Sequence, residues 1–277
     1  MKFFRSRDRV AADQKQRTRA SLTRATTLYT AGRFAEAEAE ARAVASDWSW
    51  PRHQDRPLAL RLAAAATSAQ GRHAEALAAY DRLLFDFRRE FGAKDPRTLI
   101  LRSNRAQTLA LLSRYAECEE ECAAVARTAA RGKGREMPYI LAAARNGLIY
   151  AFNGQGRHQE AEALAREALG APPGADRLAS ALRLGLARSL SGQGRYEEAL
   201  AEAERTAESR SALSEAMRYL ETGAVDLASA TALLGLGRAA EARVRASAAH
   251  DACLSAFGPD HHRTSEALEL IRRIDSA

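Results

Sequence analysis

One short pattern returns six times along the chain, and it constrains the fold more than any other feature of the sequence. The first copy reads Gly32-Arg33-Phe34-Ala35-Glu36-Ala37. The later copies begin at Gly71, Ser113, Gly156, Gly194 and Gly237, about 40 residues apart. A repeat of this length indicates an array of stacked units, because each unit is too small to bury its apolar face alone and buries it on its neighbours.

Each copy separates two segments that have helical periodicity. Apolar residues recur at i, i+3, i+4 and i+7 in segments such as 58–66 before the turn and 75–84 after it. Glycine adopts the left-handed conformation that ends a helix, and the short turn then makes the second helix antiparallel to the first. We therefore expect an all-α fold of six helix pairs, at 16–31/34–47, 57–70/73–91, 96–112/115–131, 137–153/158–169, 175–191/196–209 and 212–235/239–257, followed by a helix over 262–274.

Two positions of the repeat hold small residues. The position five residues after each turn glycine or serine holds Ala37, Ala76, Cys118, Ala161, Ala199 and Ala242. The position seven residues before it holds Ala25, Ala64, Ala106, Ile149, Ala187 and Ala230. Small side chains let two helices approach closely, so we expect both columns to be buried.

The turn with its aromatic residue and its two small columns resembles the tetratricopeptide repeat. The segments 91–99 and 257–264 both begin Phe-Gly and resemble the linker of kinesin-light-chain-type repeats, which are widespread in bacterial proteins. The resemblance covers residues 16–275. It implies a right-handed α-solenoid of six pairs, at about 16–50, 56–92, 96–132, 137–170, 175–210 and 212–258 within 16–261, with 262–277 as a C-terminal capping helix and 1–15 as a basic N-terminal arm.

The positive charge of the chain is concentrated at its beginning. Residues 1–24 contain eight Lys or Arg against two Asp, which accounts for most of the net charge of +7. Two interpretations stay open: a solvated arm, or an arm attracted to nucleic acid or to an anionic membrane. Neither a signal peptide nor a long apolar span is evident, and the three cysteines are an odd number, so we expect a cytoplasmic protein.

We find no pattern that predicts catalysis. No nucleophile is paired with a base, and Gly154-Gln155-Gly156 occupies a helix–helix turn rather than a phosphate-binding loop. The histidines are dispersed along the sequence, and His261 and His262 are expected to cap the last helix. We therefore expect no catalytic residue, no metal and no cofactor.

The first helices of successive pairs line the concave face of such an array, and polar residues there can converge on one ligand. Arginine offers a planar fork for carboxylates, and asparagine can pair with both the donor and the acceptor of a peptide backbone. The expected partner-binding residues are Arg102, Asn104, Gln107, Arg145, Asn146, Tyr150, Arg183 and Arg188. The alternative for each residue is an ordinary polar contact between helices.

The leading hypothesis is a non-enzymatic scaffold that binds a protein or peptide in this groove. One alternative is a peptide-sensing regulatory protein, in which a small signalling peptide changes the pitch of the array. The other is tethering to nucleic acid or membrane through residues 1–24.

Overall fold

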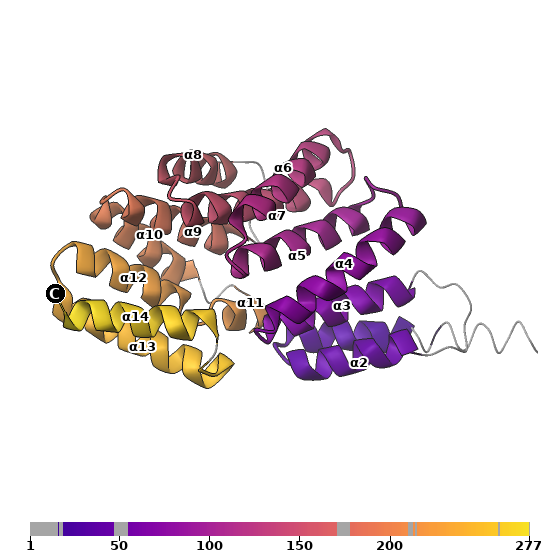
Figure 1. The fold of residues 1–277 in the computed structure, drawn as a ribbon, viewed down its shortest axis with the longest axis horizontal. Helices are drawn as coiled ribbons and strands as arrows, with labels where there is room; N and C mark the ends of the chain where they lie inside the picture. Colours follow the sequence, from indigo (N-terminus) through magenta and orange to yellow (C-terminus); the bar gives the residue numbers. More distant parts are fainter. Residues whose placement is uncertain are drawn as a thin grey trace, which may run out of the picture.

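The computed structural model describes residues 16, 19–46, 55–170, 178–209, 213, 215–259 and 261–276. Within these ranges the chain is an all-α repeat solenoid of antiparallel helix pairs without a strand, as expected (Figure 1). The predicted arm over residues 1–15 lies outside the described residues, as do 47–54, 171–177 and 210–212, where three of the expected repeat boundaries fall.

A helix over residues 19–30 precedes α2 (Phe34–Ser46) in the first pair. The next pairs are α3 (Asp55–Ala69) with α4 (His73–Glu90), α5 (Pro96–Leu111) with α6 (Tyr115–Arg131), α7 (Met137–Gly154) with α8 (His158–Leu169), and α9 (Ala179–Gly192) with α10 (Tyr196–Ser209). The last part holds α11 (Glu215–Leu220), α12 (Ala224–Gly235), α13 (Ala239–Phe257) and α14 (His262–Asp275), and α14 packs on α13.

The expectation of one helix over 212–235 is wrong, because α11 ends at Leu220 and α12 begins at Ala224. Gly223 between them has a φ of +74°. A Cβ at this position would lie 2.4 Å from Sγ of Cys253 in α13, so the backbone approaches α13 more closely than any other residue allows. Because the helix is interrupted here, α11 does not continue the line of α12 in the stacked repeats.

Both columns of small residues are buried, as predicted. No member of either column exposes more than 2% of its surface. The helices of each pair, and of neighbouring pairs, therefore meet along these positions, and larger apolar residues from the flanking helices fill the rest of the core.

At three turns, the ring that follows the Arg of the turn packs on a helix of the following repeat. A Cβ built on Gly154, Gly192 or Gly235 would lie only 2.4–2.5 Å from a ring atom of the residue that it faces. The facing residues are Tyr115, His158 and Tyr196, respectively. These glycines let a flat ring lie directly against the helix backbone, which explains the first glycine of each Gly-Gln-Gly segment.

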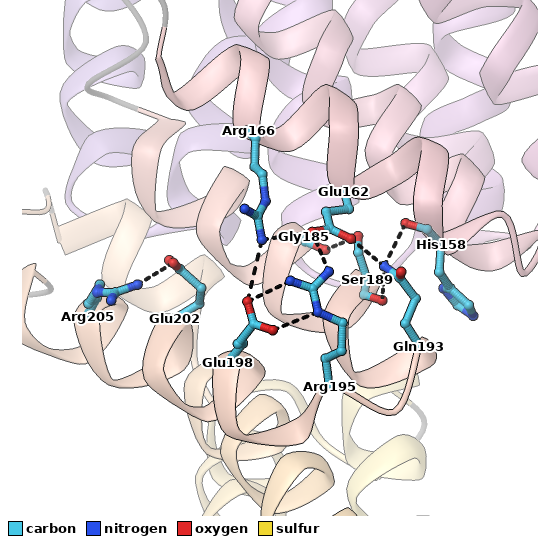
Figure 2. A network of polar contacts seen from close by, with 10 residues as sticks. All are labelled: His158, Glu162, Arg166, Gly185, Ser189, Gln193, Arg195, Glu198, Glu202 and Arg205. Carbon is cyan, nitrogen blue, oxygen red and sulfur yellow. Dashed lines mark hydrogen bonds and ion pairs between the residues drawn. The ribbon is translucent and has the colours of Figure 1, made fainter.

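At three turns, side chains of the turn also donate hydrogen bonds to a glutamate of the preceding repeat. We call this contact the Gln-Gly-Arg clasp. In the clasp of Figure 2, Gln193 Nε2 and an Arg195 nitrogen donate to the carboxylate of Glu162 at 2.7 and 2.6 Å. The equivalent clasps join Gln70 and Arg72 to Glu38, and Gln155 and Arg157 to Glu119. At the two remaining junctions Leu77 and Leu200 replace the glutamate, and Leu112 and Leu236 replace the glutamine.

The array curves until its two ends meet, with α11 lying near α2 and α3 (Figure 1). The ring of Tyr219 in α11 lies 5.2 Å from the ring of Phe34 in α2, and Leu220 packs on the cluster that contains Ala69 of α3. Arg188 of α9 forms an ion pair with Glu266 of α14 at 2.7 Å. These contacts close the concave side of the array.

None of the helices in the described ranges is both long and apolar enough to cross a membrane.

Candidate functional site

The closed array surrounds a hollow of about 150 Å³ between its first repeats and its last helices. Tyr29 and Tyr80 line it from the first two repeats, and Leu220 and Arg263 line it from α11 and α14. The hollow exists because α11 leaves the stack and reaches back to the beginning of the array. The helices far apart in the sequence therefore contribute to one site.

Helix α5 presents one face to the hollow. Asn104, Gln107, Thr108 and Leu111 all line it, and their spacing of i, i+3, i+4 and i+7 places them on one side of the helix. The hydroxyl of Thr108 donates to the backbone carbonyl of Asn104 at 2.9 Å, so it is satisfied within the helix. The side-chain amides of Asn104 and Gln107 were both predicted as partner-binding groups, and the structure brings them together at this wall.

Tyr150 and Arg188 lie beside the C-terminal wall of the hollow. The guanidinium of Arg188 is 5.2 Å from the centre of the Tyr150 ring and is paired with Glu266. Burial alone would lower the pKa of Arg188, but the charge of Glu266 and the contact with Tyr150 outweigh it and raise the pKa. Arg188 is therefore a cation held in place at the seam between α9 and α14.

The other three predicted arginines are paired within their own repeats. Arg102 donates to Glu121 at 2.7 Å, Arg145 to Glu167 at 2.5 Å, and Arg183 to Glu202 at 3.0 Å. In each case the glutamate lies on the second helix of the same pair. The expectation that a ligand has to supply these carboxylates is thus corrected: the chain supplies them. Asn146, next to Arg145 on α7, is half-buried.

Arg61, which lies near Tyr29 and Tyr80 of the hollow, is a residue that the sequence reasoning missed. It lies on α3, and its Nε atom is fully buried without a hydrogen-bond partner among the described residues. Burial lowers its pKa, because the charged form is poorly solvated there. Three tyrosines lie close enough to Arg61 to offset part of this lowering of its pKa: Tyr80, Tyr29 and Tyr139. Arg61 stands ten residues before its turn glycine, as Asn146 does, so a comparison of this repeat position with that of Asn146 could have found it.

Three histidines that are dispersed in the sequence come together at the hollow. His73, His261 and His262 place one ring nitrogen each within 4.8 Å of one another. His261 caps α14, as predicted, by accepting a hydrogen bond from the backbone N–H of Arg263 at 3.3 Å. Burial, followed by the charge of Arg263, lowers the pKa of His261 to about 4, so this ring is neutral at pH 7. Among the described residues this is the group whose donor atoms could hold a metal.

Comparison with known proteins supports the repeat interpretation. The family model described as tetratricopeptide repeat matches residues 22–96 and 123–176. No curated protein sequence matches the chain.

Several solved structures share the fold. The nearly identical tetratricopeptide-like repeats of a Podosopora anserina putative kinesin light chain are 21% identical, with a TM-score of 0.54 over 69% of this chain and 94% of that one. A Rap protein complexed with Competence and Sporulation Factor is 12% identical, with a TM-score of 0.63 over 92% and 74%. Bacillus thuringiensis PlcR, in complex with the peptide PapR7 and DNA, is 16% identical, with a TM-score of 0.59 over 86% and 82%.

Proposed function

We propose that this tetratricopeptide-repeat protein is a non-enzymatic interaction scaffold that holds a peptide, or a segment of a partner protein, against the inner face of its array. The observation that carries the proposal is the Nε atom of Arg61, which is buried and has no hydrogen-bond partner among the described residues. Burying a charge without a partner is costly, and a ligand carboxylate would relieve that cost. A carboxylate is therefore the first chemical feature that we assign to the ligand.

The amides of α5 supply the second feature. Asn104 and Gln107 line the hollow next to Tyr80, and each amide offers both donors and an acceptor. That combination matches the backbone of an extended peptide. We assign ligand contacts to Arg61, Asn104, Gln107, Tyr150 and Arg188, and we interpret Arg102, Arg145 and Arg183 as ion pairs that hold each repeat together.

A peptide of several residues has to open the array before it can bind. The hollow of about 150 Å³ is smaller than the roughly 300–1,000 Å³ of usual ligand sites. The contacts that would separate are the ring contact between Phe34 and Tyr219 and the packing of Leu220 on the cluster that contains Ala69. Ligand binding would therefore be coupled to the separation of these contacts, which can stay local or extend to a change in the pitch of the whole array.

That coupling favours one second candidate function, a peptide-sensing regulatory protein. The structures of Rap and PlcR resemble the chain over 92% and 86% of its length. The first was determined in complex with Competence and Sporulation Factor, and the second in complex with the peptide PapR7 and DNA. In this alternative, the functional response to the ligand is the opening of the array rather than the capture of a partner. Location in a bacterial cytoplasm and tethering through residues 1–24 stay predictions.

The test compares inner-face variants with a matched outer control. The protein is used as bait, and the bound proteins and peptides are quantified by mass spectrometry for the wild type, Arg61→Gln, Asn104→Ala and Arg127→Gln. Arg127 is an exposed arginine of α6. We expect a specific ligand to fall at least tenfold with Arg61→Gln and with Asn104→Ala, and to be retained with Arg127→Gln. Equal recovery with all four proteins would contradict the proposal.

X-ray scattering separates the two functions. A regulator would change its radius of gyration when the ligand is added, and a rigid scaffold that opens only locally would not.

A further inference from the structure

We propose that His73, His261 and His262 form a binding site for a divalent transition-metal ion, with Zn²⁺ as the first choice, at the seam where the two ends of the array meet. This inference goes beyond the proposed interaction function and does not depend on it. It rests on the position of the three rings, on the nitrogen atoms that they leave free, and on the chemistry of imidazole ligands.

The three rings come from opposite ends of the described chain. His73 is the first residue of α4, His261 is the N-cap of α14, and His262 is the first residue of α14. The ring centres of His73 and His262 are 5.7 Å apart, and those of His261 and His262 are 4.3 Å apart. The second repeat and the start of α14 therefore converge on this point, and all three rings line the hollow.

Two of the nitrogen atoms are buried and have no hydrogen-bond partner among the described residues: Nε2 of His73 and Nδ1 of His262. Buried polar atoms without a partner are rare in folded proteins and call for an explanation. The other nitrogen of His73, Nδ1, lies 3.4 Å from the hydroxyl oxygen of Ser68. If Nδ1 carries the proton and donates to Ser68, Nε2 presents a lone pair to the hollow, which is the tautomer of a metal ligand held by an outer hydrogen bond.

Metal binding by His261 would compete with its role as the N-cap of α14. Its Nδ1 accepts the N–H of Arg263 at 3.3 Å, a distance longer than usual for a hydrogen bond. A neutral imidazole has one lone pair, so a metal bound to His261 would take that lone pair from the helix cap. The cap is the weaker of the two interactions, and its loss leaves one N–H at the start of α14.

Some of the charges around the site oppose a bound cation, and one favours it. Burial, followed by the charge of Arg263, lowers the pKa of all three rings, that of His262 to about 2. The same charge of Arg263, and that of Arg188, opposes a cation, whereas Glu266 next to Arg188 offsets part of it.

Three imidazole nitrogens suit Zn²⁺, and also Co²⁺, Ni²⁺ and Cu²⁺, better than Mg²⁺ or Ca²⁺. A tetrahedral Zn²⁺ with Zn–N distances of about 2.0–2.1 Å needs ligand nitrogens about 3.3 Å apart, so the rings have to turn inward from their present separation of up to 4.8 Å. The fourth ligand would be water or a group of the partner. A metal bound here would join the second repeat to α14 and hold the array closed.

The test titrates the protein, without an affinity tag and freed of metal, with Zn²⁺ by calorimetry and with Co²⁺ by visible absorption. We expect one ion per chain, a visible Co²⁺ band of a four-coordinate site, and a higher melting temperature with Zn²⁺. His73→Gln and His262→Gln should each weaken Zn²⁺ binding at least tenfold. His250→Gln, which changes a histidine of α13 outside the group, should bind as the wild type does.

Two results would overturn the proposal: no saturable binding by the wild type at Zn²⁺ concentrations up to about 100 µM, or unchanged binding by both His73→Gln and His262→Gln. If either variant does not fold, the imidazole ¹⁵N resonances of the wild type decide. Zn²⁺ should shift those of His73, His261 and His262 and leave that of His250 unchanged, and any other pattern counts against the site. Arg61→Gln should keep its metal, so failure of the interaction proposal and failure of this one are distinguishable.

Discussion

Replacing Glu162 by leucine should loosen the contact between the fourth and fifth repeats. The carboxylate of Glu162 accepts hydrogen bonds from Gln193 at 2.7 Å and Arg195 at 2.6 Å, and it is paired with Arg166 at 2.8 Å (Figure 2). Because Gln193 and Arg195 belong to the turn of the following repeat, the substitution removes two contacts between repeats, in addition to the ion pair with Arg166 within α8.

The expected cost follows from exposure. The side chain of Glu162 is 13% exposed, so its bond from Gln193 falls in the range of buried bonds to a charged group, about 1.5–3 kcal/mol. Arg166 and Arg195 are 53% and 37% exposed, and pairs of this kind contribute about 0–1 kcal/mol each. Burial of the new leucine offsets part of the loss. We therefore expect Glu162→Leu to cost about 2 kcal/mol, or about 4–8 °C in melting temperature.

A double-mutant cycle tests the reasoning more sharply than the single variant. Gln193→Leu combined with Glu162→Leu reproduces the pair of leucines, Leu77 and Leu112, that the chain uses at the second junction, where they share one apolar cluster. The double variant should recover at least about 1 kcal/mol relative to the sum of the single variants. Urea denaturation measures the free energies, and hydrogen exchange in α8 and α9 localises the effect.

Glu197→Leu is the matched control, because Glu197 is an exposed glutamate of α10, and it should change stability by less than about 0.5 kcal/mol. If the two single substitutions add within about 0.3 kcal/mol, the clasp does not couple the repeats and the reasoning fails.

Three further predictions concern pH and the turns. Burial alone would raise the pKa of Glu162, but the hydrogen bonds from Gln193 and Arg195 lower it below the ordinary 4.5. The difference in unfolding free energy between the wild type and Glu162→Gln should therefore be full above about pH 5 and vanish as the pH falls through the folded-state pKa of Glu162. A difference that grows in acid would contradict this sign. Gly192→Ala should destabilise by about 1–3 kcal/mol, because its Cβ would meet the His158 ring, although alanine usually stabilises a helix; a higher melting temperature would refute the packing. Ser113 has a φ of +58°, so Ser113→Gly should relieve strain and stabilise by up to about 1 kcal/mol, and calorimetry that finds a loss would show that the serine is not strained.

The helix pairs and the buried columns could be predicted from the sequence, because both depend on spacing within one repeat. The positions of Ala37 and its equivalents follow directly from the period of the helix and the place of the turn. The clasp also has a signal in the sequence. Glutamate six residues after one turn glycine or serine occurs with glutamine just before the next turn, and leucine at the first position occurs with leucine at the second.

The site could be predicted only in part, because it depends on the curvature that accumulates over six repeats. Asn104 and Gln107 could be predicted because they are polar residues on the first helix of a pair. The meeting of His73 with His261 was not, since nothing in a single repeat indicates that the ends of the array touch. The pairing of Arg102 with Glu121 was missed because the partner lies on the next helix at a position where the repeat pattern prescribes no residue type.

The closed array is the central claim, because both the hollow and the histidine group depend on it. A Cβ built on Gly32 would lie 3.7 Å from the Cβ of Tyr219, which is a distance that a disulfide spans. The measurement is the yield of intramolecular disulfide in Gly32→Cys/Tyr219→Cys under mild oxidation. The control is Gly156→Cys/Tyr219→Cys, since Gly156 is an equivalent turn glycine with a φ of +76° and no atom within 4 Å of its Cβ position. The closed array predicts efficient crosslinking of the first pair and none of the second. Equal yields from the two, or crosslinks only between molecules, would show that the ends do not meet.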